Sequence, residues 1–122
     1  TAEGLKTGLA KLKDIRKEFE TELFIPGAKE GMNIELDKAF RLDDFITMGQ
    51  LIAYDALNRE ESCGGHFREE HQTEEGEAKR DDENFFYVAC WEYQGSDDKA
   101  PVLLKEPLVY EAIKVQTRNY KS

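Results

Sequence analysis

The residues best able to do chemistry lie in one short segment, Arg59–Arg68, which reads Arg-Glu-Glu-Ser-Cys-Gly-Gly-His-Phe-Arg. It follows a long helical pattern and precedes an acidic stretch. Gly64 and Gly65 can take the positive φ angles that end a helix, because glycine has no Cβ. We call this segment the hinge, and its charged groups make it the candidate site.

Two glutamates in the hinge break a local rule. Arg59 suits the partly negative end of a helix, whereas Glu60 and Glu61 do not, and each misplaced charge costs roughly 0.3–1 kcal/mol when exposed. Two unfavourable charges at one helix end indicate that a cation or a row of hydrogen-bond donors outside the helix binds these carboxylates. His66 and Arg68 follow directly and are the candidate donors. The alternative is a self-contained, hydrogen-bonded end of the helix.

No catalytic, metal-binding or cofactor-binding pattern emerges. Cys63, His66 and His71 are only three ligands at a spacing that fits no common zinc pattern, so a loop cysteine and two solvated or capping histidines are the better interpretation. The acidic stretch lacks the alternating oxygen ligands and central glycine of an EF-hand loop. No phosphate loop, dinucleotide fingerprint or nucleophile elbow occurs.

Composition restricts the class of function. The chain has 122 residues, one domain or a piece of one, with 17 basic and 26 acidic residues and a net charge of −9. This argues against nucleic acid and anionic membranes, which are bound through Lys and Arg. No membrane-spanning run or signal peptide is found. Cys63 and Cys90 form no CxxC pair, which favours two reduced thiols in a cytoplasmic protein over the alternative of a single disulfide.

Two long helices must position the hinge. Thr1 can cap the first helix, which should end near Phe24 because Pro26 disfavours helical geometry before it. Asn33 can cap the second helix, which is predicted to run to about Ser62. The apolar residues of the first helix form one stripe: Leu5, Leu9, Leu12, Ile15, Phe19 and Leu23.

The second helix has two apolar stripes, so it should pack against two neighbours. The first stripe is Leu36, Ala39, Phe40, Ile46, Ala53 and Leu57, and the second is Leu42, Phe45, Gly49, Ile52 and Ala56. The chain supplies only one other clear helix. We expect the second neighbour to be the C-terminal region, another copy of the chain, or a segment cut away before Thr1.

β-structure is expected after the hinge. Residues 69–83 are strongly acidic and predict an exposed loop. A strand covered on both faces is predicted for Phe85–Tyr93, followed by a turn at Gly95–Asp98. The second strand of an antiparallel hairpin is predicted for Leu108–Thr117, with Val102–Leu104 as an optional extra rung.

The predicted fold class is α+β, mainly α. A long antiparallel helix pair (1–63) precedes an acidic loop (64–83) and a β-hairpin extension (84–122), all within a single domain fragment. The tail Arg118–Ser122 should fray.

Two segments at fixed spacing, the hinge and Arg80-Asp81-Asp82-Glu83-Asn84-Phe85, carry a specific pattern of polar residues. The pattern resembles the C-terminal domain of the flavoprotein subunit of succinate dehydrogenase and fumarate reductase, in the same superfamily as L-aspartate oxidase. That family shows Arg-x-Glu-Ser-Arg-Gly-Ala-His-x-Arg, an acidic loop, then Arg-Asp-Asp-x-x-Trp and a β-hairpin. The matching positions are Arg59, Glu61, Ser62, Gly64, His66, Arg68, Arg80, Asp81 and Asp82. Similarity over Gly4–Phe19 extends the resemblance to essentially the whole chain.

The chain departs from the family pattern at several positions. Cys63 replaces the usual Arg, Gly65 replaces Ala, and Phe85 replaces Trp. The loop between Arg68 and Arg80 is longer than usual. These departures resemble the fumarate-reductase-like branch of bacterial succinate dehydrogenases more than the aspartate oxidases.

The resemblance implies a three-helix bundle whose first helix precedes Thr1, within a subunit that uses FAD to interconvert succinate and fumarate. It implies electron transfer to an iron–sulfur subunit, an indirect link to a membrane cytochrome b subunit, and a place on the cytoplasmic side of the bacterial inner membrane. The FAD-binding and capping domains of that family are not in this sequence. We therefore expect the chain alone to bind no FAD and to be inactive, and the matching residues to dock it on the flavin domain or the iron–sulfur subunit.

A second hypothesis comes from a different class of protein. The chain could act as a stand-alone acidic helical interaction module whose exposed stripe binds a partner helix. On either hypothesis, the isolated chain should cover Leu42, Phe45 and Ile52 by self-association or by folding its hairpin over the second helix.

Overall fold

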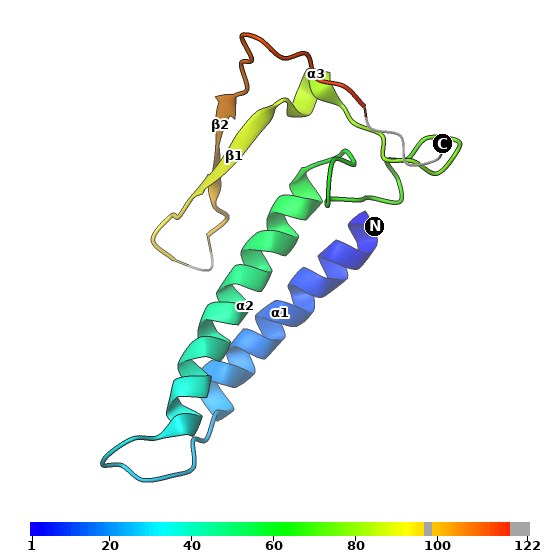
Figure 1. Cartoon of the computed structure of the whole chain (residues 1–122). Helices are drawn as coiled ribbons and strands as arrows, with labels where there is room; N and C mark the ends of the chain where they lie inside the picture. Colours follow the sequence, from blue (N-terminus) through cyan, green and yellow to red (C-terminus); the bar gives the residue numbers. More distant parts are fainter. Residues whose placement is uncertain (97–98, 118–122) are drawn as a thin grey trace. The chain divides into compact units, whose positions relative to one another are not determined.

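The structure is a computed structural model that describes residues 1–96 and 99–117. Its elements are α1 (Ala2–Glu22), α2 (Ile34–Asn58), α3 (Asp82–Phe85), β1 (Tyr87–Glu92) and β2 (Val102–Pro107) (Figure 1). Two long helices followed by an antiparallel hairpin confirm the predicted class, α+β and mainly α. The chain divides into two compact units, Thr1–Asn58 and Arg59–Ser122. The predicted fraying at 118–122, and residues 97–98 of the predicted turn, lie outside the described residues.

Helix α1 begins where the sequence predicts. The Thr1 hydroxyl accepts a hydrogen bond from the Gly4 N–H at 3.1 Å. This N-cap satisfies one of the free donors in the first turn. The helix ends at Glu22, and Leu23 is already extended, with φ −63° and ψ 122°. The end lies just before the predicted position near Phe24, since the proline that follows disfavours helical geometry in the residue before it.

The start of α2 also confirms the sequence prediction. The Asn33 side-chain oxygen accepts hydrogen bonds from the N–H groups of Glu35 at 3.0 Å and Leu36 at 3.2 Å. Acidic residues in the first turn add a favourable interaction with the partly positive helix end.

The end of α2 differs from the prediction. The helix stops at Asn58 and not near Ser62. The Asn58 side-chain amide donates to the Tyr54 carbonyl at 2.7 Å and so occupies one acceptor of the last turn. Glu60 and Glu61 therefore lie beyond the helix, and the unfavourable placement inferred for them does not arise.

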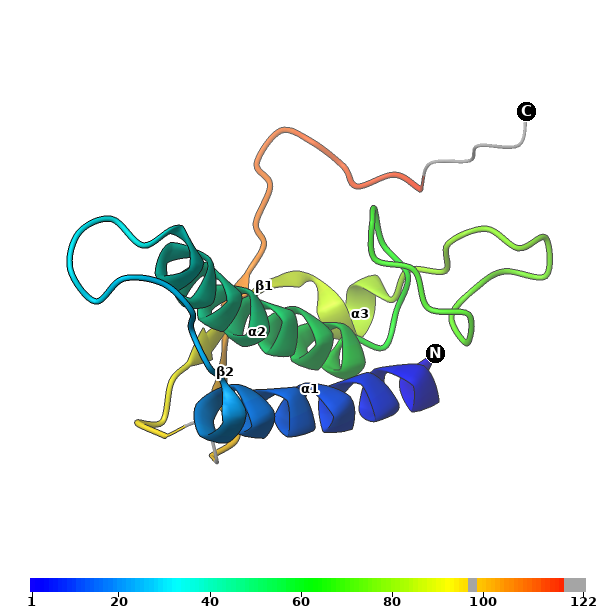
Figure 2. The same cartoon turned by 90° about the horizontal axis from the view of Figure 1, so that it is seen from below.

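Helices α1 and α2 lie side by side and antiparallel within the unit Thr1–Asn58 (Figures 1 and 2). Gly49 packs against α1, because a Cβ built there would lie 3.9 Å from the Leu12 methyl carbons. A polar contact adds to this packing: the Arg16 guanidinium donates to Asp43 Oδ1 and to the Thr47 hydroxyl, each at 2.6 Å.

The two stripes predicted for α2 are partly confirmed. Ala39 and Ile46 of the first stripe are buried, but Phe40 is 66% exposed and does not belong there. Gly49, assigned to the second stripe, instead packs against Leu12 of α1. The remaining large residues of the second stripe are exposed, with Leu42 at 44%, Phe45 at 69% and Ile52 at 63%. An apolar face of α2 is therefore left uncovered by α1.

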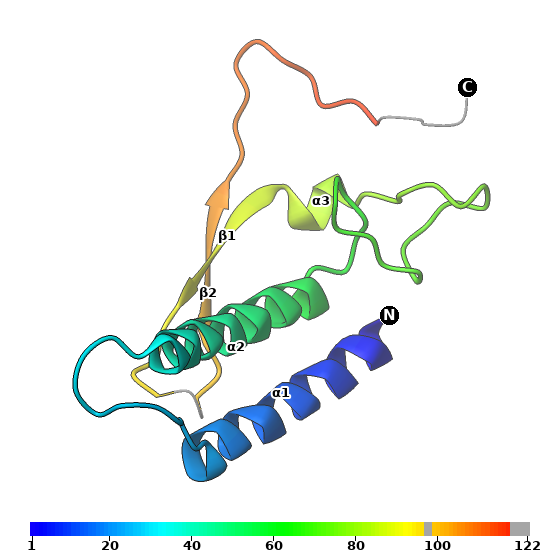
Figure 3. The same cartoon turned by 60° about the horizontal axis from the view of Figure 1, so that its bottom comes forward.

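The unit Arg59–Ser122 contains the hairpin that Figure 3 shows after the short helix α3. Strands β1 and β2 are antiparallel, and their register places Tyr87 opposite Pro107 and Glu92 opposite Val102. Residues Tyr87, Ala89 and Trp91 are half-buried, whereas the alternate residues of β1 are exposed. The prediction that both faces of this strand are covered is therefore wrong for this chain.

The second strand was predicted too late in the sequence. It spans Val102–Pro107, which includes the extra rung predicted at Val102–Leu104, whereas the predicted stretch Leu108–Thr117 is irregular. Proline has no N–H with which to continue the ladder beyond residue 107. The Leu108 N–H instead donates to the Phe86 carbonyl at 3.2 Å. The alternating apolar residues that predicted a strand here have exposed side chains; Val109, for example, is 82% exposed.

Candidate functional site

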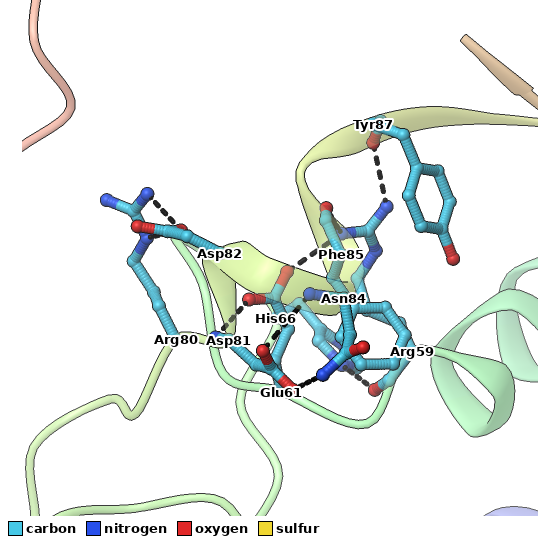
Figure 4. A network of polar contacts seen from close by, with 9 residues as sticks. All are labelled: Arg59, Glu61, His66, Arg80, Asp81, Asp82, Asn84, Phe85 and Tyr87. Carbon is cyan, nitrogen blue, oxygen red and sulfur yellow. Dashed lines mark hydrogen bonds and ion pairs between the residues drawn. The ribbon is translucent and has the colours of Figure 1, made fainter. Parts of the chain in front are cut away.

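Arg59 is the hub of the hinge (Figure 4). Its Nη1 donates to Glu61 Oε1 at 2.8 Å and to the Phe85 carbonyl at 3.1 Å, and its Nη2 donates to the Tyr87 carbonyl at 3.2 Å. The guanidinium also lies over both aromatic rings, 5.8 Å from the Phe85 centroid and 5.2 Å from that of Tyr87. Arg59 therefore ties the hinge to the start of β1.

The carboxylate of Glu61 is 3% exposed and fully engaged. One oxygen pairs with Arg59, and Oε2 accepts a hydrogen bond from the Asp81 N–H at 2.9 Å. The prediction that a cation and donors meet this carboxylate is thus confirmed for Glu61, whereas Glu60 is exposed. The donors were misidentified, because neither His66 nor Arg68 supplies them.

Ser62 and Arg68 close the hinge into a loop. Ser62 is completely buried, and its hydroxyl accepts from the Arg68 N–H at 2.8 Å and donates to the Arg68 carbonyl at 3.2 Å. The Arg68 side chain is also buried and pairs with Glu70 at 3.2 Å. The Ser62 N–H donates to the Lys79 carbonyl at 2.9 Å, which joins this loop to the acidic segment.

The tip of the hinge is a tight turn. Cys63 and His66 exchange two backbone hydrogen bonds, at 2.8 and 3.1 Å. Gly64 has a φ of +59°, as predicted, but Gly65 does not have a positive φ. His66 Nε2 donates to the Arg59 carbonyl at 2.9 Å, which fixes the ring. The turn at residues 63–65 is exposed, as are Glu60 and Phe67 of the hinge.

Within the acidic segment, residues 71–79 form a folded arm that is closed by backbone hydrogen bonds. Gln72 and Ala78 form a β-bridge, and the Thr73 N–H donates to the Glu77 carbonyl at 2.8 Å. Most of its carboxylates are exposed, as the sequence predicts. The arm ends at Lys79, whose N–H donates to the His71 carbonyl at 3.2 Å.

Asp81 caps helix α3. Its carboxylate accepts from the Asn84 N–H at 3.2 Å and from the Asn84 side-chain amide at 2.9 Å. Hydrogen bonds from Asn84 hold the pKa of Asp81 below its ordinary value of 3.8. The neighbouring Arg80 pairs with Asp82 and donates to the Gln116 carbonyl at 3.2 Å. Arg80 and Asp82 thus lie outside the network around Arg59.

Sequence reasoning missed main-chain partners of the hinge and the side-chain partner of Asp81. Two of these partners are the backbone carbonyls of Phe85 and Tyr87. Every residue type has a backbone carbonyl, so no sequence pattern could have identified them. Asn84 could have been found, because an Asp followed three residues later by a polar residue is typical of a cap.

Metal ligands are not clustered in the described residues, where no three His, Cys, Asp or Glu side chains could hold an ion. Cys63 and Cys90 are both free and exposed. Among the described helices, none is long and apolar enough to cross a membrane.

A family model described as the fumarate reductase flavoprotein C-terminus matches residues 1–120. No curated protein matches the chain.

Proposed function

The chain belongs to the family of fumarate reductase flavoprotein C-terminal domains, and we propose from this that it supports FAD-dependent interconversion of succinate and fumarate as one domain of a larger subunit. In this proposal the subunit passes electrons to an iron–sulfur subunit and contacts a membrane cytochrome b subunit only indirectly. The complex would lie on the cytoplasmic side of the bacterial inner membrane. The hinge network built on Arg59 is the observation that supports this, since it joins Glu61, His66 and Asp81, which match the family pattern.

FAD does not fit the described residues of this chain. A flavin dinucleotide needs a glycine-rich turn between a strand and the N-terminus of a helix to hold its pyrophosphate. Helices α1 and α2 each begin at a side-chain cap, Thr1 and Asn33, and α2 follows a loop and not a strand. We therefore assign FAD to other parts of the full subunit and derive no reaction step from this chain.

The role that we propose for this chain is docking. Four hinge residues form hydrogen bonds within the chain and so fix the shape of its surface: Arg59, Glu61, Ser62 and Arg68. The groups that remain for a partner include the exposed turn at residues 63–65 and the Arg80–Asp82 pair. We propose that these contact the FAD-binding domain of the same subunit or the iron–sulfur subunit.

Gly65 offers a direct test of docking. A Cβ added there has no atom within 4 Å, and its φ is not in the left-handed region, so a side chain can be added without strain. In the full subunit, Gly65→Gln should reduce co-purification with the iron–sulfur subunit and succinate-dependent turnover, because it adds bulk to the turn. The control is Gly8→Gln in α1, which is equally open. Assembly and turnover unchanged by Gly65→Gln would contradict docking through this turn.

A stand-alone interaction module is the second candidate, favoured by the exposed apolar face of α2. The mass of the natural protein separates the two. A chain of flavoprotein size supports the first proposal, and a natural chain of 14.0 kDa supports the second.

A further inference from the structure

A cavity in the unit Arg59–Ser122 carries cations although the chain as a whole has a charge of −9. Its volume is about 650 Å³, and it is bordered by the loop segment 79–81, by α3 and by Lys105 of β2. Small-molecule sites commonly have volumes of about 300–1,000 Å³. The cations at its border are Lys79, Arg80 and Lys105, and His71 adds an imidazole.

The acidic groups at the border form no ion pair with the two lysines. The Asp81 carboxylate is engaged by the N–H and the side-chain amide of Asn84. Glu60 is the other carboxylate, and it is exposed. Within residues 1–96 and 99–117, neither Lys79 nor Lys105 forms an ion pair. Two lysines that form no ion pair within the described residues therefore border one concave space.

Two of the three cations are held in place before any ligand arrives. The Arg80 guanidinium is fixed by Asp82 and by the Gln116 carbonyl. The Lys105 ammonium lies 4.4 Å from the centroid of the Tyr87 ring, a cation–π contact that orients it. Binding groups that are already ordered lose less conformational entropy when a ligand binds.

We propose that this cavity, the anion pocket, binds a small anion with two or more negative charges on carboxylate or phosphate groups. Lys79 and Lys105 supply charge, while Arg80 and His71 can supply N–H donors. Phe85 forms an apolar wall. The proposal goes beyond docking and does not depend on it.

The experiment is an NMR titration of the ¹⁵N-labelled chain at constant ionic strength, with inorganic phosphate in one series and succinate in another. The amides of Lys79, Arg80 and Lys105 should shift saturably with at least one probe. Saturation by phosphate alone identifies a phosphate ligand, and saturation by succinate alone a carboxylate ligand. No saturable shift with either probe would overturn the proposal.

Charge removal separates a site from general attraction of anions. The double variant Lys79→Gln/Lys105→Gln should bind about tenfold more weakly, because two nearby charges are lost. The control Lys11→Gln/Lys13→Gln removes the same charge from α1 and should bind as the parent does. Equal weakening in both would refute the pocket. If the glutamine variant loses its native spectrum, Lys79→Arg/Lys105→Arg keeps the charges, and loss of binding in that folded variant would also count against the proposal.

Discussion

Arg59 and Glu61 show why the polar residues of the hinge occur together. Glu61 is buried, and a buried carboxylate requires a cation or several donors. Arg59 supplies the charge, and the Asp81 N–H supplies the second donor. Because Arg59 also holds the Phe85 and Tyr87 carbonyls, one side chain links the hinge to the hairpin.

Glu61→Gln should lower the free energy of unfolding of the unit Arg59–Ser122 by about 3 kcal/mol, because it leaves a largely buried guanidinium without its counter-charge. Urea denaturation followed by fluorescence measures this, since Trp91, the only tryptophan, lies in β1. Glu60→Gln is the matched control, and it should change stability little because Glu60 is exposed. Equal effects of the two variants would show that the pair contributes no more than a surface charge.

Asp81 gives a prediction about pH. Its pKa is lowered in the folded state, so its charge contributes stability in full above 3.8, the ordinary value. That contribution is lost as pH falls through the lower pKa of the folded state. The stability difference between the parent chain and Asp81→Asn should therefore be constant near neutral pH and shrink below pH 3.8. Trp91 fluorescence during urea denaturation at several pH values measures it, with Glu83→Gln as control. A difference that grows on acidification would contradict the assignment.

At the scale of elements, Gly49 lies where α2 packs against Leu12 of α1. A methyl group there would sit at ordinary van der Waals distance from Leu12. Gly49→Ala should therefore stabilise α2 by up to about 1 kcal/mol, through the higher helix propensity of alanine. Thermal unfolding followed by circular dichroism measures the change. Gly8→Ala, in an open position of α1, is the control. Destabilisation by Gly49→Ala alone would mean that the helices lie closer together than the structure has them.

The helices were easier to predict than the hairpin, for reasons visible in particular residues. Thr1 and Asn33 are side-chain caps, and their chemistry is local, so both helix starts follow from sequence. The position of β2 depends on which segment pairs with β1, and that is a non-local choice. Alternating apolar residues in Leu108–Thr117 suggested a strand, yet the shorter connection to Val102–Pro107 forms the ladder.

The hinge was predictable as a polar cluster but not as a network. Residue types showed that Glu61 needs partners, and family resemblance marked Arg80 and Asp81. The main-chain partners of Arg59 could not be predicted from the sequence, because any residue at positions 85 and 87 has a backbone carbonyl. The end of α2 was predicted too late, because the hydrogen bond from the Asn58 side chain to the Tyr54 carbonyl was not foreseen.

At the scale of the whole molecule, the uncovered face of α2 has the largest consequence. Phe45 and Ile52 expose more than half of their surface, and Leu42 is 44% exposed. Contiguous exposed apolar residues of this kind mark interaction surfaces in soluble proteins. In the full subunit we propose that another segment of the protein packs here. Helix α1 packs against Gly49 of α2 but leaves these three side chains exposed.

The isolated chain should therefore self-associate in sedimentation experiments as its concentration is raised. The variant Phe45→Ser/Ile52→Ser should shift it toward monomer, because it removes two large apolar side chains from this face. The control Val109→Ser/Ile113→Ser removes two residues that are at least as exposed, 82% and 71%, but lie outside α2. Only the α2 variant should change the association constant. A parent chain that stays monomeric at all concentrations, or equal shifts in both variants, would show that exposure on α2 does not drive association.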